Sequence, residues 1–135
     1  MQYDHFVGQV QHRAQLASSG EAVHAIRCTL QTLTQRLLPG EAHDLAAQLP
    51  REIGIYLERD PQAKVERLSL NDFFHRVSEC ETANLPAAVF HARVVIEVLC
   101  EAVSPGEIHD VLSELPEEYL SLFQAGSRGS LAGRK

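Results

Sequence analysis

The chain contains one short motif twice: "PGEAHDLAAQLP" at Pro39–Pro50 and "PGEIHDVLSELP" at Pro105–Pro116, offset by 66 residues. Seven of the twelve positions are identical. A repeat of this kind is read before anything else, because a missed repeat leads to the wrong fold. The duplication indicates either one structural corner built twice or one site used in duplicate.

The repeat extends beyond the motif on both sides. Upstream, "HFVGQV" at residues 5–10 matches "DFFHRV" at residues 72–77, and downstream "LPREIGIYL" matches "LPEEYLSLF". A unit of about 52 residues therefore occurs twice. We predict a single domain over residues 1–125, which divides into repeat one at about 4–59, a linker at 60–68 and repeat two at about 69–124, followed by a flexible basic tail at 126–135.

Apolar residues in each unit recur at helical spacing, as in Ala22, Ile26, Leu30, Leu33 and Leu37. The equivalent stripe in the second unit is Ala92, Ile96, Leu99 and Val103. The pattern contains no alternating strand run and no Asn-Gly or Asp-Gly hairpin signal. We therefore predict an all-α fold. The predicted helices span residues 4–17, 21–38 and 41–49, a fourth that Pro50 opens, then 70–81, 86–103, 107–115 and 116–123.

Neither unit is large enough to stand alone, because a domain of roughly 65 residues buries too little of its surface. Packing the two leftover apolar faces together contributes about 25 cal/mol per Å² of apolar area removed from water. We therefore predict one compact bundle of about eight helices, built from two tandem four-helix repeats with pseudo-twofold symmetry. Gly8 and Gly54, which lie inside predicted helices, indicate close helix contacts in the first unit.

Composition narrows the classes of partner. Hydrophobic residues make up 44% and charged residues 22%, a balance typical of a globular protein. No run of 18 apolar residues and no signal sequence is visible, so we expect a cytoplasmic protein with no membrane partner. The net charge is −6, and the basic tail leaves −9 on the remaining residues, which disfavours nucleic acid as a partner.

The three cysteines are Cys28, Cys80 and Cys100, and they form no CxxC pair. Their odd number and their spacing argue against a disulfide framework or a zinc ribbon. We expect Cys28 and Cys100 to be small buried side chains.

The repeated Gly-Glu-x-x-Asp-x-x-x-x-Leu-Pro pattern, together with "FVGQV" and "EEYLSLF", resembles the bacterial family catalogued as domain of unknown function 2267. The resemblance covers the chain from about Tyr3 to Phe123. It implies a helical duplicated domain found in bacteria. It implies no activity, and no functional residues are carried over from it.

The candidate site residues are those of the duplicated motif, namely Glu41, His43, Asp44, Glu107, His109 and Asp110. The structural interpretation is that acids in a first helical turn interact favourably with the helix dipole, by about 0.3–1 kcal/mol each. In this interpretation Pro-Gly ends the preceding helix, and the glycine supplies the backbone freedom of the corner.

The alternative interpretation is a metal site, because carboxylates three residues apart share a helix face. An added imidazole completes a ligand set that suits iron, manganese or zinc. However, each histidine lies one or two residues from the acids and points about 100–200° away from them on a helix. One motif cannot close around one ion, so the twin motifs would have to meet.

Arg27 and Arg93 occupy equivalent positions beside the two apolar stripes. We predict that each reaches a motif acid, Asp44 or Asp110, and holds the corner onto the long helix. Anion binding by the two arginines is the other interpretation.

The pattern favours a non-enzymatic protein-interaction or scaffolding module, with another protein or a second copy of the chain as its partner. We expect no cofactor and no bound metal. The alternative function is a metal-binding protein or metal-dependent enzyme that uses the duplicated Glu-x-His-Asp motif.

Overall fold

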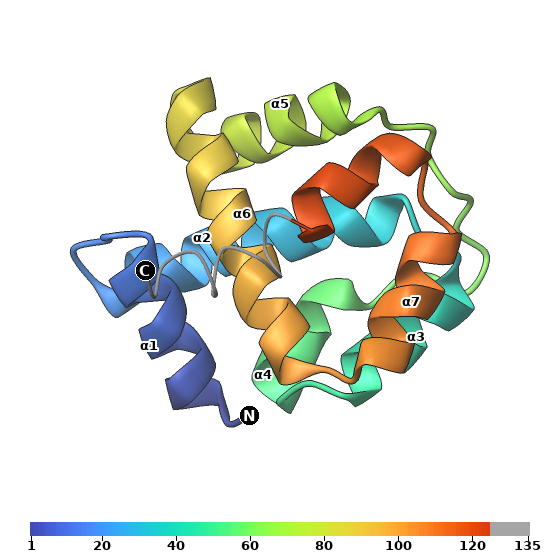
Figure 1. Cartoon of the computed structure of the whole chain (residues 1–135), viewed down its shortest axis with the longest axis horizontal. Coiled ribbons are helices and arrows are strands. Elements are labelled where there is room, and N and C mark those ends of the chain that lie inside the picture. The colour runs from blue at the N-terminus through green and yellow to red at the C-terminus, as the bar shows by residue number, and fades with distance from the viewer. Residues whose placement is uncertain (125–135) are drawn as a thin grey trace.

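The computed structural model describes residues 1–124, and every regular element in this range is a helix (Figure 1). The all-α prediction is therefore confirmed. Residues 120–124 are helical, and the preceding elements, in which η denotes a 3-10 helix, are α1 (Tyr3–Arg13), α2 (Ser19–Gln35), α3 (Pro39–Ala47), α4 (Arg51–Gly54), η1 (Ile55–Leu57), α5 (Leu70–Glu81), α6 (Leu85–Ala102), α7 (Pro105–Ser113) and η2 (Glu117–Tyr119).

Short polar side chains start the long helices. The Ser18 hydroxyl accepts a hydrogen bond from the Glu21 amide at the start of α2. Ser69 and Asp72 form a reciprocal capping box at the start of α5, where each side chain accepts from the backbone N–H of the other residue. These bonds satisfy amides that have no partner within the helix. The predicted helix at residues 70–81 is confirmed.

The Pro-Gly dipeptides open helices instead of ending them. The α2 helix already ends at Gln35, and Pro39 and Pro105 are the first residues of α3 and α7. No glycine among the described residues has a positive φ, so the predicted glycine corner is wrong. The physical reason is that the fixed φ of proline suits the first helical position, where its missing N–H has no intrahelical acceptor to lose.

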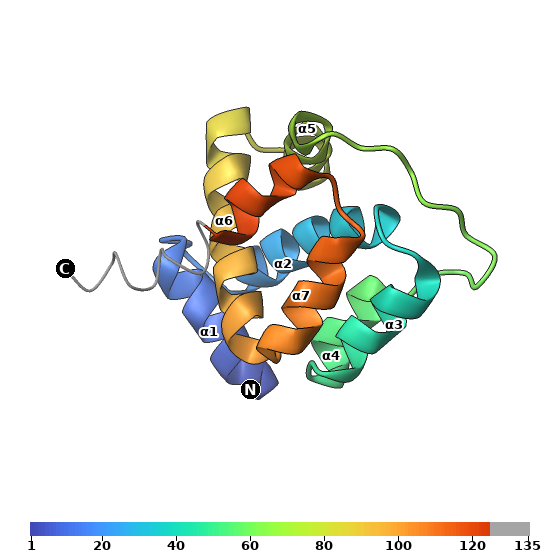
Figure 2. The same ribbon diagram turned by 45° about the vertical axis from the view of Figure 1, so that its right-hand side comes forward.

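Both halves of the chain contribute to one hydrophobic core. The two predicted apolar stripes are buried throughout, including Ile26 on α2 and Ile96 on α6. The α2 helix packs against both α5 and α6 of the second half (Figures 1 and 2). Each half begins with three α-helices and ends in a short helical segment, α4 followed by η1 in the first half and η2 followed by residues 120–124 in the second. The pseudo-twofold symmetry of the complete halves stays a prediction.

One polar contact joins the two halves, and another fixes the connecting segment to the second half. The Arg13 guanidinium on α1 binds Glu97 and Glu101 of α6, the latter at 2.8 Å. Tyr119 is fully buried and donates its hydroxyl proton to the Leu68 carbonyl at 2.9 Å. These contacts hold together segments that lie far apart in the sequence.

The connection between the halves, residues 58–69, contains no helix and forms the extended loop visible in Figure 2. It includes the predicted linker at 60–68. The predicted basic tail at 126–135 lies outside the described residues. Within residues 1–124, no single helix is long and apolar enough to cross a membrane. Helices α5 and α6 together have the length and composition of a membrane span, but the pair is bent by 101°.

The two helical glycines differ from each other. A Cβ atom added at Gly54 would lie 2.9 Å from the Ala46 carbonyl oxygen, which confirms close packing between α3 and α4. A Cβ atom at Gly8 would meet nothing within 4 Å. The prediction of a close contact at Gly8 is therefore wrong.

Candidate functional site

The two copies of the motif form helices α3 and α7, which lie side by side (Figures 1 and 2). The Leu38 amide at the start of α3 donates to Glu114 Oε1 at 2.9 Å, just past the end of α7. The Ser104 amide at the start of α7 donates to Gln48 Oε1 at 2.8 Å, just past the end of α3. The helices therefore run antiparallel, and equivalent motif positions make equivalent bonds. Each copy caps the other.

Acidic side chains converge at this α3–α7 junction. Glu41 and Glu107 are the third residues of their helices, and Asp110 lies one turn after Glu107. One carboxylate oxygen from each of the three lies within 4.8 Å of the other two. These residues come from both copies of the motif, and we call them the carboxylate cluster.

Two oxygens of the carboxylate cluster are buried without compensation. Glu107 is only 7% exposed. Among the described residues, the Oε2 atoms of Glu41 and Glu107 are inaccessible to solvent and have no hydrogen-bond partner. A buried carboxylate that is neither paired nor hydrogen-bonded costs free energy. The cluster can avoid that cost by taking up a proton or a cation.

The raised pKa of Glu107 favours uptake of a proton by the cluster. Burial raises the pKa of Glu107 to about 8, with a hydrogen bond to Glu41 and its charge as the next causes. The charges of Asp44 and Asp110 raise the pKa further. The raised pKa favours a proton on the pair, which two close carboxyl groups can share; without a proton or a cation the two Oε2 atoms have no partner within residues 1–124.

The histidines of the motif lie outside the carboxylate cluster. The His109 side chain is 84% exposed, and its nearest acidic atom is Asp110 Oδ1 at 3.8 Å. His43 is exposed and lines a separate surface cleft between α3 and η1, together with Arg51 and Ile55. The group that the structure assembles therefore contains carboxylates only.

The predicted arginine clamp is wrong. Arg27 donates to Nδ1 of His24 at 2.7 Å, one turn earlier on the same helix. Arg93 is exposed, and among the described residues no ion pair joins either arginine to a motif acid. His24 lies three residues before Arg27 and therefore on the same face of α2, so the Arg27 guanidinium binds this local partner and not a motif acid on another helix.

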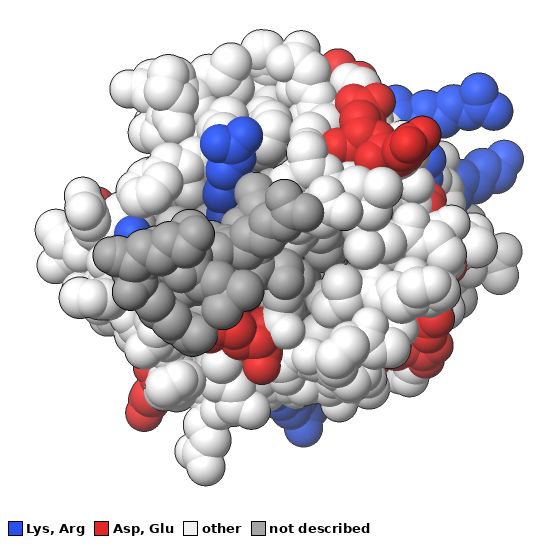
Figure 3. All heavy atoms as spheres, in the orientation of Figure 1, with Lys and Arg blue, Asp and Glu red and all other residues white. Residues whose placement is uncertain are grey.

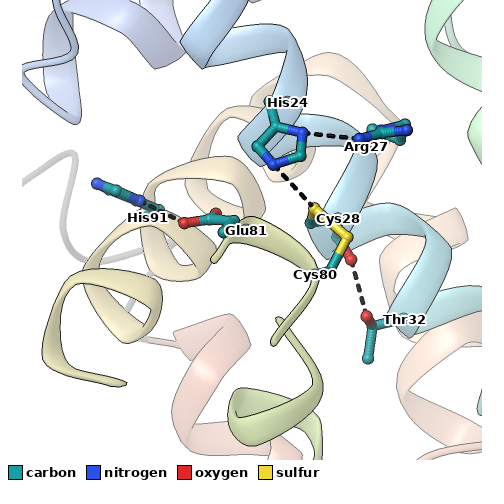
Figure 4. The surroundings of a disulfide bond; sticks show 7 residues. All are labelled: His24, Arg27, Cys28, Thr32, Cys80, Glu81 and His91. Carbon is teal, nitrogen blue, oxygen red and sulfur yellow. Dashed lines mark hydrogen bonds and ion pairs between the residues drawn. A yellow bond between two sulfur atoms is a disulfide. The ribbon is translucent and has the colours of Figure 1, made fainter. Parts of the chain in front are cut away.

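A disulfide between Cys28 and Cys80 joins α2 to α5, with 5.6 Å between the Cα atoms (Figure 4). The prediction that the cysteines form no disulfide is therefore wrong. Cys100 keeps a free thiol, and burial raises its pKa to about 11. An odd cysteine count leaves one thiol over but does not exclude one pair. No local signal marks a partner 52 residues away.

The fold and the junction define a helical protein with a duplicated motif whose two copies meet through their acids. The family described as uncharacterized conserved protein (DUF2267) matches residues 3–122, and the chain belongs to this family. The resemblance stated from the motif is thereby confirmed. None of the curated proteins matches the chain. The family description names no ligand and no reaction, so function has to be argued from the site.

Proposed function

We propose that the protein is a helical cation-binding module, in which the carboxylate cluster holds a divalent cation across the α3–α7 junction. The observation that carries the proposal is the pair of buried Oε2 atoms, on Glu41 and Glu107, that lack a partner. The three ligand oxygens lie within 4.8 Å of one another. Ligands on opposite sides of a calcium ion are about 4.6–5.2 Å apart, so the spacing suits one ion.

The chemistry of the ligands selects the class of ion. Glu41, Glu107 and Asp110 offer oxygen atoms only, which suit hard cations such as Ca²⁺, Mn²⁺ and Mg²⁺. Zinc and iron sites in proteins draw on imidazole or thiolate, and neither group belongs to the cluster. The Asp110 side chain is 62% exposed, so water can reach that side and complete the coordination. The proposed ligand set therefore contains three of the four motif acids, without Asp44, and neither of the motif histidines.

The bound cation would act as a link between the two halves. Glu41 belongs to the first half, whereas Glu107 and Asp110 belong to the second. A cation that all three coordinate replaces the repulsion among them with attraction to a common centre. This role is a binding function and involves no catalytic step.

The predicted protein partner stays a prediction. Among residues 1–124, Ile55 on η1 and Phe90 on α6 are exposed large hydrophobic side chains, and Met1 and Leu38 are exposed outside the helices. On the face shown in Figure 3, outside the grey region, two basic side chains lie close together at the upper right beside acidic ones, and the other basic side chains are isolated. Neither feature marks one surface as the place where a partner would bind.

Isothermal titration of chelator-treated protein with Ca²⁺, Mn²⁺ and Mg²⁺ tests the proposal. We expect one site for at least one of these ions, and loss of that site in Glu107→Gln and Glu41→Gln. Glu79→Gln is the matched control, because Glu79 is an exposed acid on α5. Wild-type binding by Glu107→Gln, or no binding of any of the three ions, would overturn the proposal.

The histidines separate this proposal from the alternative that uses the whole Glu-x-His-Asp motif. His43→Asn and His109→Asn should bind Mn²⁺ as the wild type does, because neither ring belongs to the carboxylate cluster. If both substitutions abolish metal binding, or if only zinc binds, then the ligand set proposed here is wrong.

A further inference from the structure

The Cys28–Cys80 disulfide lies beside polar side chains whose arrangement suits thiol–disulfide exchange (Figure 4). His24 lies one turn before Cys28 on α2, with its Nε2 atom 3.9 Å from the Cys28 sulfur. Arg27 donates to the other nitrogen of the same ring, Nδ1, at 2.7 Å. The three residues thus form a chain of contacts that ends at one sulfur.

This chain of contacts fixes the tautomer of His24. An arginine side chain only donates hydrogen bonds, so Nδ1 has to be the accepting nitrogen. The proton of the neutral ring is therefore on Nε2, the nitrogen that faces Cys28. An N–H group in that position stabilises a thiolate on Cys28, and a more stable thiolate is a better leaving group.

The two sulfurs differ in their exposure. Cys28 is fully buried, whereas Cys80 is partly exposed. A surface cleft on this side of the molecule is lined by His24 and by Glu81, the residue that follows Cys80. An incoming thiolate therefore reaches Cys80 more readily than Cys28.

From this geometry we infer that the Cys28–Cys80 disulfide is a reducible cross-link that accepts two electrons from a dithiol. A thiolate of the dithiol attacks the Cys80 sulfur, and the Cys28 sulfur leaves with the electron pair of the broken S–S bond. His24 Nε2–H stabilises the Cys28 thiolate, which then takes a proton. The second thiol of the dithiol attacks the mixed disulfide and releases Cys80, so the dithiol is oxidised and two protein thiols form.

Reduction would release a covalent tie between the two halves, because α2 belongs to the first and α5 to the second. Arg27 is then a positioning residue, which acts by holding the His24 tautomer. The carboxylate cluster lies on other helices, α3 and α7, so failure of the cation proposal leaves this inference intact.

The test is the rate of reduction by dithiothreitol near neutral pH, followed by alkylation and peptide mapping of Cys28 and Cys80. We expect the rate to be first order in dithiothreitol and about tenfold slower in His24→Leu, which corresponds to the loss of one hydrogen bond to a charged group. His24→Gln, whose amide can still donate, should recover much of the rate. His12→Leu, which changes an exposed histidine on α1, should leave the rate unchanged.

Single-cysteine variants test the direction of attack. In a Cys100→Ser background, the Cys80 thiol of Cys28→Ser should react with an aromatic disulfide reagent faster than the Cys28 thiol of Cys80→Ser. Two results would overturn the inference. One is a reduction rate that is independent of dithiothreitol, which means that the bond opens only on unfolding; the other is equal reduction of His24→Leu and wild type.

Discussion

Replacing Glu107 with glutamine should make the protein more stable at high pH and leave it nearly unchanged at low pH. The pKa of Glu107 is raised from its ordinary value of 4.5 to about 8, chiefly by burial. Between these two values the folded protein holds a proton that the unfolded chain has released. The stability associated with that proton is complete below the lower value and is lost as pH rises through the higher one.

The size of the effect follows from the shift. Each pH unit in this interval lowers the free energy of unfolding by about 1.4 kcal/mol, so the whole interval amounts to at most about 5 kcal/mol. Because Asp110 at the edge of the cluster is open to water, screening and small rearrangements should reduce this. We therefore expect Glu107→Gln to exceed the wild type by about 2–3 kcal/mol at about pH 9, since glutamine carries no charge there.

Urea denaturation in the presence of a chelator, at about pH 5, 7 and 9, measures this difference. Acids that do not interact with Glu107 contribute equally in both proteins, so the difference between wild type and Glu107→Gln reports on Glu107 and the acids coupled to it. Glu79→Gln, the exposed control on α5, should follow the wild type at every pH. A difference that is the same at about pH 5 and about pH 9 would refute the reasoning, because it would mean that Glu107 carries no extra proton in the folded state.

Three further predictions concern stability and can be measured by the same denaturation method. Gly54→Ala should destabilise the protein by more than about 1 kcal/mol, because the added methyl group meets a backbone oxygen, whereas Gly8→Ala should stabilise it by up to about 1 kcal/mol; the reverse order would contradict the packing. Reducing the Cys28–Cys80 disulfide should lower stability by about 4 kcal/mol, from the entropy of a loop that spans 52 residues, and no change in the urea midpoint would contradict it. Tyr119→Phe should cost about 1–2 kcal/mol, because the Leu68 carbonyl loses its donor, and wild-type stability would count against that bond.

The sequence was sufficient for the features that depend on local pattern. The apolar stripes centred on Ile26 and Ile96 have helical spacing, and both are buried in the structure. The start of α5 at Ser69 and Asp72 was predictable because a capping box needs only residues three apart. Pro39-Gly40 was misread because proline next to a helix fits either its end or the start of the next one.

Features that depend on the approach of distant helices could not be predicted in this way. The spacing of apolar residues shows which face of a helix is buried, but it does not show the direction in which that helix packs against another helix. The antiparallel contact of α3 and α7, which decides that Glu41 meets Glu107, is a property of the tertiary packing. The same holds for Cys28 and Cys80, since each position shows only a cysteine on a helix. The position of Arg27 suggested a partner on another helix, but its partner His24 was local.

The helix-dipole account of the motif explains only part of what is observed. It predicts acids in a first helical turn, and Glu41 and Glu107 lie in the first turns of α3 and α7 as it requires. It does not predict that the Glu107 side chain is buried against Glu41. The Ser104 hydroxyl already accepts a hydrogen bond from the Glu107 amide, so capping of α7 does not require the Glu107 side chain to be buried. Two acids that could have faced water instead face each other.

A proton and a cation compete for this pair, and the competition has a sign that can be measured. A cation at a hundred times its dissociation constant stabilises the folded protein by about 2.7 kcal/mol. Glu107→Gln loses a ligand and should gain little. At about pH 9 the variant should therefore be the more stable protein in chelator, and the wild type should equal or exceed it once the cation saturates the site. If saturating cation leaves the advantage of the variant unchanged, the pair binds a proton alone.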